Sequence, residues 1–286
     1  MPSLIDLRRR IRSVRNTQQI TRAMKMVSTA RLRRAQDRVL QARPYARSLR
    51  ELVENAAAAA SASERLARHP LLVRRPEERL QLILMTSDRG LAGAFNANLI
   101  KAAQAFLQQH SGARVELELI GRKGRDFFRK RGAAISGEHI GLANRGRYED
   151  VAPIAEKMLR RYAAKEIDAV YLLYNEFKSM LAQRLEVRRV LPVELPEAAA
   201  PTEYITERPP EELLDALLPQ YVKVMIHHAL LESTAAEHAA RMTAMDAATS
   251  NAEELIDKLT LHLNRVRQAS ITREIIEVVT GAAGLE

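Results

Sequence analysis

The fold of this chain is decided by residues 221–266, YVKVMIHHALLESTAAEHAARMTAMDAATSNAEELIDKLTLHLNRV, which contain neither glycine nor proline. The same holds for all 61 residues between Pro219 and Gly281 and for the 41 residues between Pro2 and Pro44. Glycine and proline most often end helices, so both stretches predict helices far longer than the three or four turns typical of globular proteins. Two long helices at the ends of a chain indicate a shaft.

Apolar residues in both stretches recur at alternating spacings of three and four. Because such a pattern extends over seven heptads, it predicts a left-handed coiled coil. The connecting segment must return the chain, so we expect the two helices to pair antiparallel. In the C-terminal stretch, 11 of 14 positions are apolar in the series Tyr221, Val224, His228, Leu231, Ala235, His238, Met242, Met245, Thr249, Ala252, Ile256, Leu259, Leu263 and Val266. The N-terminal stretch has a matching series of Leu4, Leu7, Ile11, Val14, Met24, Val27, Leu32, Ala35, Val39 and Ala42.

Polar residues interrupt both series. They occur at residues 16–19 in the first helix and at His228, His238 and Thr249 in the last. Polar residues inside a coiled coil often fix the register of the two helices. The two histidines are ten residues apart, which matches no common metal-ligand spacing, so we expect interior histidines rather than ligands.

The net charge of +10 is concentrated at the beginning of the chain. Residues 1–50 hold 14 Lys and Arg residues against only Asp6 and Asp37, which gives +12 and leaves −2 for the other 236 residues. The arginines step around every side of the predicted helix, and no aromatic residue precedes Tyr45. A nucleic-acid-binding surface more often gathers its charge on one face and adds aromatic side chains for stacking. We therefore expect an acidic protein partner rather than nucleic acid.

The middle of the chain predicts a small α/β domain. Nine of the 11 glycines lie between Gly90 and Gly146, which indicates compact, turn-rich structure. The alternation of strands and helices predicts a mostly parallel, Rossmann-like sheet. Strands are predicted at residues 80–86, 114–120 and 169–174, with an edge strand at 180–190, and helices at 96–109, 125–131 and 148–164. We expect an N-terminal shaft helix at 1–66, an inserted domain at 77–195 and a C-terminal shaft helix at 210–286.

We predict no catalytic site, no metal site and no cofactor. The chain has no cysteine, which excludes disulfides and thiolate chemistry. The turn from Ser87 to Asn96 has glycines at positions 90 and 93, which fit neither the dinucleotide-binding pattern nor the P-loop. No apolar run approaches the roughly 18 residues that a spanning helix needs, so we expect no direct membrane insertion.

The last helix continues beyond Val266 as an apolar tail that includes Ile271, Ile275, Ile276, Val278 and Val279. Nothing in the rest of the chain is left to cover this tail. Exposed apolar surface of this kind indicates an interface with another molecule. A frayed terminus is the alternative explanation.

Four stretches of sequence resemble the gamma subunits of F-type ATP synthases, and the resemblance extends over essentially the whole chain. They are IRSVRNTQQITRAMKMV at 11–27, SDRGLAGAFN at 87–96, RMTAMDAATSN at 241–251 and NRVRQASIT at 264–272. In that family the two terminal helices form a central shaft inside a ring of alpha and beta subunits, which hold the catalytic sites. The resemblance implies a non-catalytic rotor shaft that transmits torque between a membrane c ring and the catalytic head. Proton flow would thereby be coupled to ATP synthesis or hydrolysis.

The resemblance also implies where partners bind. The residues implied to contact the beta subunit are Arg8, Arg9, Met24, Lys25, Arg267, Gln268 and Thr272. Those implied to rest in an apolar bearing are Ile275, Ile276, Val278 and Val279. Tyr204 and Glu207 match the foot that contacts the c ring, in a stretch that matches the family less well. Phe95 departs from the family, since tyrosine is common at that position.

The implied assembly holds one copy of the chain with alpha, beta and epsilon subunits and the c ring. Its implied place is peripheral, on the cytoplasmic side of a bacterial inner membrane. An organellar transit peptide is disfavoured by apolar periodicity that continues to Ala42, and a mature organellar form is a further alternative. A nucleic-acid-binding coiled coil and an enzyme built on the α/β domain also stay open. The first would show steep salt dependence, and the second would need a ligand pocket in that domain.

Overall fold

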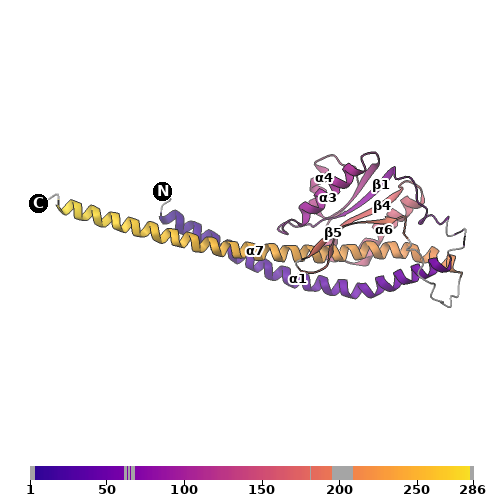
Figure 1. Cartoon of the computed structure of the whole chain (residues 1–286), viewed down its shortest axis with the longest axis horizontal. Coiled ribbons are helices and arrows are strands. Elements are labelled where there is room, and N and C mark those ends of the chain that lie inside the picture. The colour runs from indigo at the N-terminus through magenta and orange to yellow at the C-terminus, as the bar shows by residue number, and fades with distance from the viewer. Residues whose placement is uncertain are drawn as a thin grey trace. The chain divides into compact units, whose positions relative to one another are not determined.

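The computed structural model of the 286-residue chain describes residues 4–60, 63, 65, 68–180, 182–194 and 209–283 (Figure 1). Two long helices, α1 (Leu4–Ala59) and α7 (Pro210–Ala283), flank an α/β segment in the order of the chain. The chain divides into two compact units. Unit 1 consists of residues 1–28 and 242–286, and unit 2 consists of residues 29–241.

Both long helices extend past the prolines that border the two stretches without glycine or proline. Pro44 lies inside α1 and Pro219 lies inside α7. A proline inside a helix removes one backbone hydrogen bond. Pro44 is exposed, where water can hydrate the carbonyl group that loses its partner.

The buried stripe of α1 follows alternating steps of three and four along the whole helix. Val27 was expected in this stripe but is 53% exposed, whereas Ser28 is 3% exposed and occupies it. Val27 was predicted because its side chain is apolar, whereas Ser28 is buried because the helical period places it on the buried side. The stripe therefore continues through polar residues, and its buried or half-buried positions are Leu4, Leu7, Ile11, Val14, Gln18, Thr21, Lys25, Ser28, Leu32, Ala35, Val39, Ala42, Ala46, Leu49, Val53 and Ala56.

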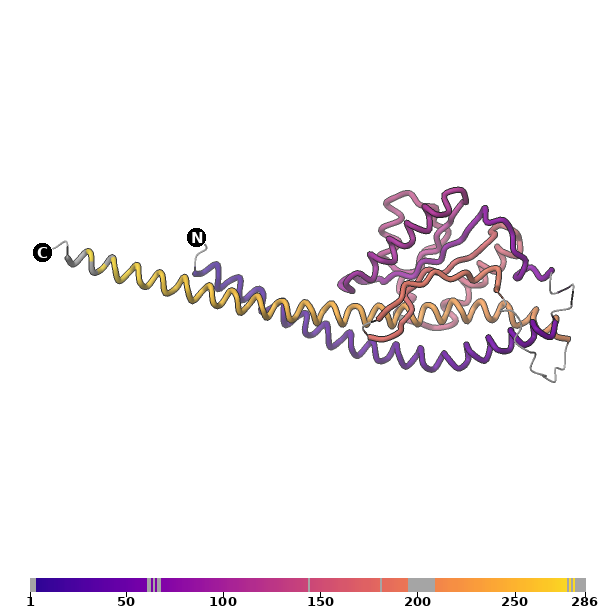
Figure 2. The backbone as a smooth tube through the Cα atoms, in the orientation of Figure 1, coloured from indigo at the N-terminus to yellow at the C-terminus, as the bar shows by residue number. Residues whose placement is uncertain are grey.

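The two helices pair antiparallel, as predicted, and the contacts within each unit show it (Figure 2). In unit 1, Thr249 Oγ1 donates to Thr21 Oγ1 at 2.8 Å, and Lys25 Nζ lies 2.5 Å from Asp246 Oδ1. In unit 2, Arg43 pairs with Glu232 at 3.3 Å. Residue numbers thus rise along one helix as they fall along the other. All 14 positions predicted for the seam of α7 are buried or half-buried.

The inserted segment forms one five-stranded sheet in the order β3-β2-β1-β4-β5. The first four of these strands are parallel, and β5 pairs antiparallel with β4 at the edge, which confirms the mostly parallel sheet with an added edge strand. The strands are β1 (Arg79–Met85), β2 (Arg114–Ile120), β3 (Ile135–His139), β4 (Ala169–Phe177) and β5 (Gln183–Leu191). The helices between them are α3 (Phe95–Gln109), α4 (Arg122–Arg129), α5 (Leu142–Arg145) and α6 (Tyr148–Ala163).

The sheet of unit 2 lies between two layers of helices. Helices α3 and α4 cover one face. The other face contributes Ile83, Val170 and Leu172 to a core shared with α6, the C-terminal part of α1 and the beginning of α7. Burial of this continuous apolar surface is the main stabilising contribution to unit 2.

Strand β3 and helix α5 were not predicted, and the chemistry of β3 explains the omission. Its sequence ISGEH has no apolar alternation because its polar side chains serve a buried carboxylate. Glu118 on β2 is fully buried and accepts hydrogen bonds from Ser136, His139 and Lys157, each at 2.7 Å. A Cβ atom at Gly137 would lie only 2.2 Å from a Glu118 oxygen, so the strand can approach only with glycine there.

Candidate partner-binding surfaces

The turn after β1, from Ser87 to Asn96, is held rigidly by its own side chains. The Asn96 side chain accepts a hydrogen bond from the backbone N–H of Ser87 at 3.0 Å. Asp88 accepts from the backbone N–H groups of Arg122 at 3.1 Å and Gly141 at 2.9 Å. Leu91, in contrast, has φ +64° and is 62% exposed. A leucine in the left-handed region is uncommon and persists where its surroundings enforce it, so this turn presents an apolar side chain on a fixed support.

Arg241 on α7 joins this turn to the long helix. Its guanidinium donates to the carbonyl oxygens of Gly90 and Arg89, both at 3.2 Å, and to Glu237 at 2.7 Å. Arg241 and Glu237 are each 7% exposed, so the ion pair is buried. Two stretches quoted for the family resemblance, 87–96 and 241–251, therefore meet at Arg241. Sequence reasoning missed this residue's role, although the Glu-Arg spacing of four residues on a helix was a signal for it.

The charges around Arg241 shift two neighbouring groups. Burial raises the pKa of Glu237, against the charge of Arg241, which lowers it. Burial, together with the positive charges of Arg241 and Arg31, lowers the pKa of His238 to about 4. His238 is therefore neutral near pH 7 and acts as a buried interior histidine, as expected from its place in the series.

The beta-contact residues predicted in the N-terminal part of α1 lie in unit 1. Arg8 and Arg9 are exposed, whereas Met24 and Lys25 are half-buried beside α7. The Lys25 ammonium pairs with Asp246, and both side chains remain about half exposed, at 41% and 56%. Their positions leave these residues available at the surface of unit 1.

The beta-contact residues predicted on α7 are also exposed. Arg267, Gln268 and Thr272 all lie on the surface of unit 1. The Thr272 hydroxyl donates to the carbonyl oxygen of Gln268 at 3.0 Å, one turn back along the helix. Gln268 and Thr272 are thus neighbours on one side of α7.

The apolar tail is uncovered among the residues that the structure describes. Exposed fractions are 48% for Ile271, 57% for Ile275, 58% for Ile276 and 72% for Val278. The helix continues to Ala283, and the Val279 side chain lies outside the described part. Tyr204 and Glu207, predicted to form a foot, also lie outside the described residues.

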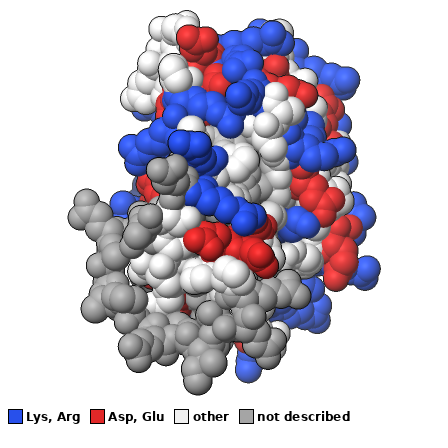
Figure 3. Space-filling model, turned by 90° about the vertical axis from the view of Figure 1, so that its right-hand side faces the viewer, with Lys and Arg blue, Asp and Glu red and all other residues white. Residues whose placement is uncertain are grey.

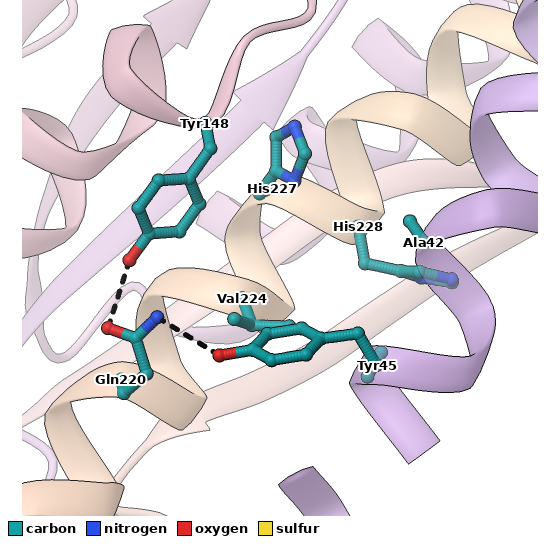
Figure 4. Close-up of a pocket in the computed structure, with 8 residues that line it drawn as sticks. Ala42, Tyr45, Tyr148, Gln220, Val224, His227 and His228 are labelled. Atoms are coloured by element: carbon teal, nitrogen blue, oxygen red, sulfur yellow. Dashed lines mark hydrogen bonds between the residues drawn. The ribbon is translucent and has the colours of Figure 1, made fainter. Parts of the chain in front are cut away.

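A cavity of about 320 Å³ lies between α1, α6 and α7 within unit 2 (Figure 4). The Tyr148 hydroxyl donates to Gln220 at 3.0 Å, and the Gln220 amide donates to the Tyr45 hydroxyl at 3.5 Å. His227 donates from Nε2 to the carbonyl oxygen of Gly146 at 3.1 Å, so this nitrogen is already used. The lining has no carboxylate and holds no nucleophile with a base beside it. No sequence pattern predicted this cavity.

Other classes of site are not formed within the described ranges. No group of three or more His, Cys, Asp or Glu side chains in this part could hold a metal ion. No helix in the same ranges is long and apolar enough to cross a membrane. On the face shown in Figure 3, Lys and Arg side chains lie among Asp and Glu side chains.

Solved structures share this architecture. One is the central stalk and c ring of the Tetrahymena thermophila mitochondrial ATP synthase, with a TM-score of 0.61, 24% identity, and coverage of 80% of this chain and 99% of that chain. Another is the OSCP/F1/c-ring part of the Euglena gracilis mitochondrial ATP synthase, with a TM-score of 0.67, 16% identity, and coverage of 99% and 94%. The fold is that of the long-helix chains found in such assemblies.

Sequence comparison gives the family. A family model described as ATP synthase matches residues 3–285. The ATP synthase gamma chain of Solibacter usitatus is 64% identical over 286 residues, and that of Anaeromyxobacter sp. is 49% identical over 291, each covering all of both chains. The gamma chain of Desulfitobacterium hafniense is 48% identical over the full length. This chain belongs to the family of ATP synthase gamma chains.

Proposed function

We propose that this chain is the central rotor shaft of a bacterial ATP synthase, transmitting torque between a membrane c ring and a catalytic head of alpha and beta subunits. The observation that carries the proposal is the full-length relationship to ATP synthase gamma chains, at 64% identity over 286 residues. The antiparallel pairing of α1 with α7 supports it, because a shaft needs two strands that resist twisting together. In this proposal residues 1–66 and 210–286 form the shaft and residues 77–195 form the inserted domain.

Torque transmission requires no reaction on this chain. Proton flow turns the c ring, the shaft turns with it, and the asymmetric shaft forces each beta subunit in turn through binding, synthesis and release of ATP. The chain is therefore a non-catalytic subunit without a cofactor of its own. The ATP chemistry belongs to the alpha and beta head.

The exposed residues of unit 1 supply the contacts with the head. Arg8, Arg9, Met24 and Lys25 meet acidic segments of beta subunits, and Arg267, Gln268 and Thr272 engage a beta loop. The exposure of the three α7 residues supports this assignment, since no described part of the chain covers them. A charged group on a turning shaft should pair with one beta subunit after another rather than with a single permanent partner. Weak, exposed ion pairs suit such exchange.

The apolar tail acts as the bearing of the shaft. Ile275, Ile276 and Val278 expose more than half of their surface, and Val279 belongs to the same run of sequence. An apolar sleeve around them would remove this surface from water at about 25 cal/mol per Å² without imposing directional bonds. Non-directional contact suits a part that must rotate against its neighbour.

The foot, to which Tyr204 and Glu207 belong, rests on the c ring with the epsilon subunit beside it. The chain is peripheral to the membrane, on the cytoplasmic side of a bacterial inner membrane. One copy serves each complex.

Co-expression of this chain with alpha and beta subunits tests the proposal. Native mass spectrometry should give one copy per three alpha and three beta subunits, and ATP hydrolysis should differ between complexes with and without the chain. If no complex forms and the chain binds DNA instead, the shaft is refuted in favour of a basic coiled coil.

Two matched arginine variants test the contacts. In the complex, removing one partner of an enclosed charged contact costs about 3–5 kcal/mol, whereas an exposed pair is worth about 0–1 kcal/mol. Arg267→Ala should therefore reduce coupled turnover more than Arg9→Ala does. Equally small effects of both variants on assembly and turnover would contradict the assignment of Arg267 to the beta contact.

A further inference from the structure

Four arginine side chains from three separate stretches of sequence line one cavity of unit 2, with a volume of about 490 Å³. Arg50 comes from α1, Arg74 from the segment before β1, and Arg188 and Arg189 from β5. The cavity belongs to unit 2, whereas the residues assigned to beta contacts all belong to unit 1. Its lining contains a single carboxylate, that of Glu194.

The carboxylates near the cavity do not neutralise its arginines. Glu194 is shared, because it pairs with Arg74 at 3.2 Å and also with Arg189. Arg189 in addition pairs with Glu77 at 3.1 Å, and Arg50 pairs with Glu54 at 2.8 Å. Four guanidinium groups thus share three carboxylates. Like charges held together in this way attract an anion from solution.

Arg188 is the arginine of this cavity that has no partner among the described residues. Within the described part of the chain, it makes no hydrogen bond and no ion pair. Tyr221, Arg50 and Arg188 all line the cavity, where burial raises the pKa of Tyr221, the charges of Arg50 and Arg188 lower it, and the charge of Glu54 raises it. The Tyr221 hydroxyl likewise has no hydrogen-bond partner among the described residues. The Arg188 guanidinium and the Tyr221 hydroxyl therefore line the cavity without an acceptor among the described residues, and Arg50 beside them is paired with Glu54.

The rest of the lining is apolar. Val187, Val190 and Val193 contribute from β5 and the residues after it, and Met225 contributes from α7. A small inorganic halide would gain nothing from these side chains. An anion that carries several oxygen atoms on one end and an organic group on the other would use both parts of the cavity.

We propose that this cavity binds a phosphate group, held by Arg188, Arg50 and the Tyr221 hydroxyl, with any organic substituent on the valines and Met225. Guanidinium groups match phosphate because their planar donors pair with two oxygen atoms at once. The cavity would accept the group either as a soluble phosphate or as the headgroup of an anionic phospholipid. This inference does not depend on the chain being a rotor.

Titration calorimetry on the full-length chain alone tests the inference, because alpha and beta subunits would bind phosphate themselves. The probes are inorganic phosphate and phenyl phosphate at constant ionic strength, with chloride as the blank. Saturable binding should weaken at least tenfold in Arg188→Gln and measurably in Tyr221→Phe. The matched control is Arg184→Gln. Among the described residues, Arg184 is an exposed residue of the same strand that pairs only with Glu186, at 3.4 Å, and it does not line the cavity.

Vesicle co-sedimentation distinguishes the two sources of phosphate. Binding to vesicles of phosphatidylglycerol and phosphatidylcholine, but not of phosphatidylcholine alone, with loss in Arg188→Gln, would assign a lipid headgroup. Binding of soluble phosphates with no Arg188-dependent vesicle binding would assign a soluble ligand. If neither probe binds in a manner that Arg188→Gln weakens and Arg184→Gln leaves intact, the proposal is wrong. Circular dichroism of both variants verifies that they fold.

Discussion

Helix α7 has two different environments along its length. Within unit 2, every residue from Leu231 to Ala239 is buried, including the polar Glu232, Ser233 and Glu237. Within unit 1, the fully buried residues of α7 in the described part are the seam positions Met245 and Ala252, and most residues between the seam positions are exposed. The same helix therefore serves as a core element in one unit and as a surface element in the other.

The difference shows where each part obtains its stability. Unit 2 buries α7 against its own sheet and α1, with small side chains such as Ala235, Ala236 and Ala239 permitting close approach. Unit 1 has only one partner helix for α7 and leaves Ile275 and Val278 in water. In unit 2 the chain itself covers α7, whereas in unit 1 much of the apolar surface of the helix stays exposed.

The largest expected effect comes from the buried ion pair of unit 2. Arg241→Ala leaves Glu237 buried without its partner and removes two bonds to the Ser87–Asn96 turn, so it should cost about 3–5 kcal/mol of unfolding free energy. Urea denaturation followed by circular dichroism measures this. A cost below about 1 kcal/mol would show that the turn is held by other contacts and that unit 2 does not depend on this pair.

Acid should weaken unit 2 through Glu118. Burial alone would raise its pKa, but hydrogen bonds from His139, Lys157 and Ser136, with the charge of Lys157, lower the pKa from 4.5 to about 2. The folded-state pKa lies below the unfolded value, so this stabilisation, of about 3 kcal/mol, is present above pH 4.5 and is lost as the pH falls toward 2.

Thermal unfolding of Glu118→Gln against pH checks this prediction. The variant should be less stable than the wild type at neutral pH, and the two should converge as the pH falls from about 4.5 to 2. A constant difference across that range would mean that ionisation of Glu118 contributes nothing.

Two alanine substitutions on one helix compare the units directly. Ala236→Val adds volume to the packed part of α7 and should cost about 1–3 kcal/mol. Ala247→Val, at an exposed position in unit 1, should cost only the helix-propensity difference, below about 0.7 kcal/mol. The propensity term is common to both, so the difference in urea midpoint isolates packing. Equal costs would contradict the contrast between the two environments.

The smallest effect is expected for the exposed ion pair of unit 1. Asp246→Asn removes the partner of Lys25 and should cost about 0–1 kcal/mol, because both side chains are partly solvated. The loss should shrink further at high salt. A double-mutant cycle with Lys25→Met measures the pair, and a coupling energy well above 1 kcal/mol would reveal a stronger contact than this exposure allows.

The sequence predicted most of the fold because its main signals are periodic. Long series of apolar residues identified both helices and their antiparallel pairing, and strand-helix alternation identified the parallel sheet. Val27 was preferred to Ser28 because polarity was weighed above the helical period.

The unpredicted features depend on contacts between residues that are distant in sequence. Strand β3 was not predicted because its polar residues Ser136 and His139 bind a carboxylate that is 18 and 21 residues away in sequence. The Arg241 contacts cross about 150 residues, and the arginine-lined cavity joins three stretches. No local sequence pattern predicts such long-range contacts. The beta contacts, the bearing and the foot came from family resemblance, and the arginine variants above address the beta contacts.

The end of the buried run in α7 has a mechanical consequence. Packing encloses the helix up to Arg241, and beyond that residue most of its surface is free within unit 1. A helix enclosed over one part of its length and free over the next behaves like a beam clamped at one end. Any sideways load on the free part then produces its greatest bending moment at the clamp. Arg241, tied to two backbone carbonyls and to Glu237, stands at that point and acts as a brace.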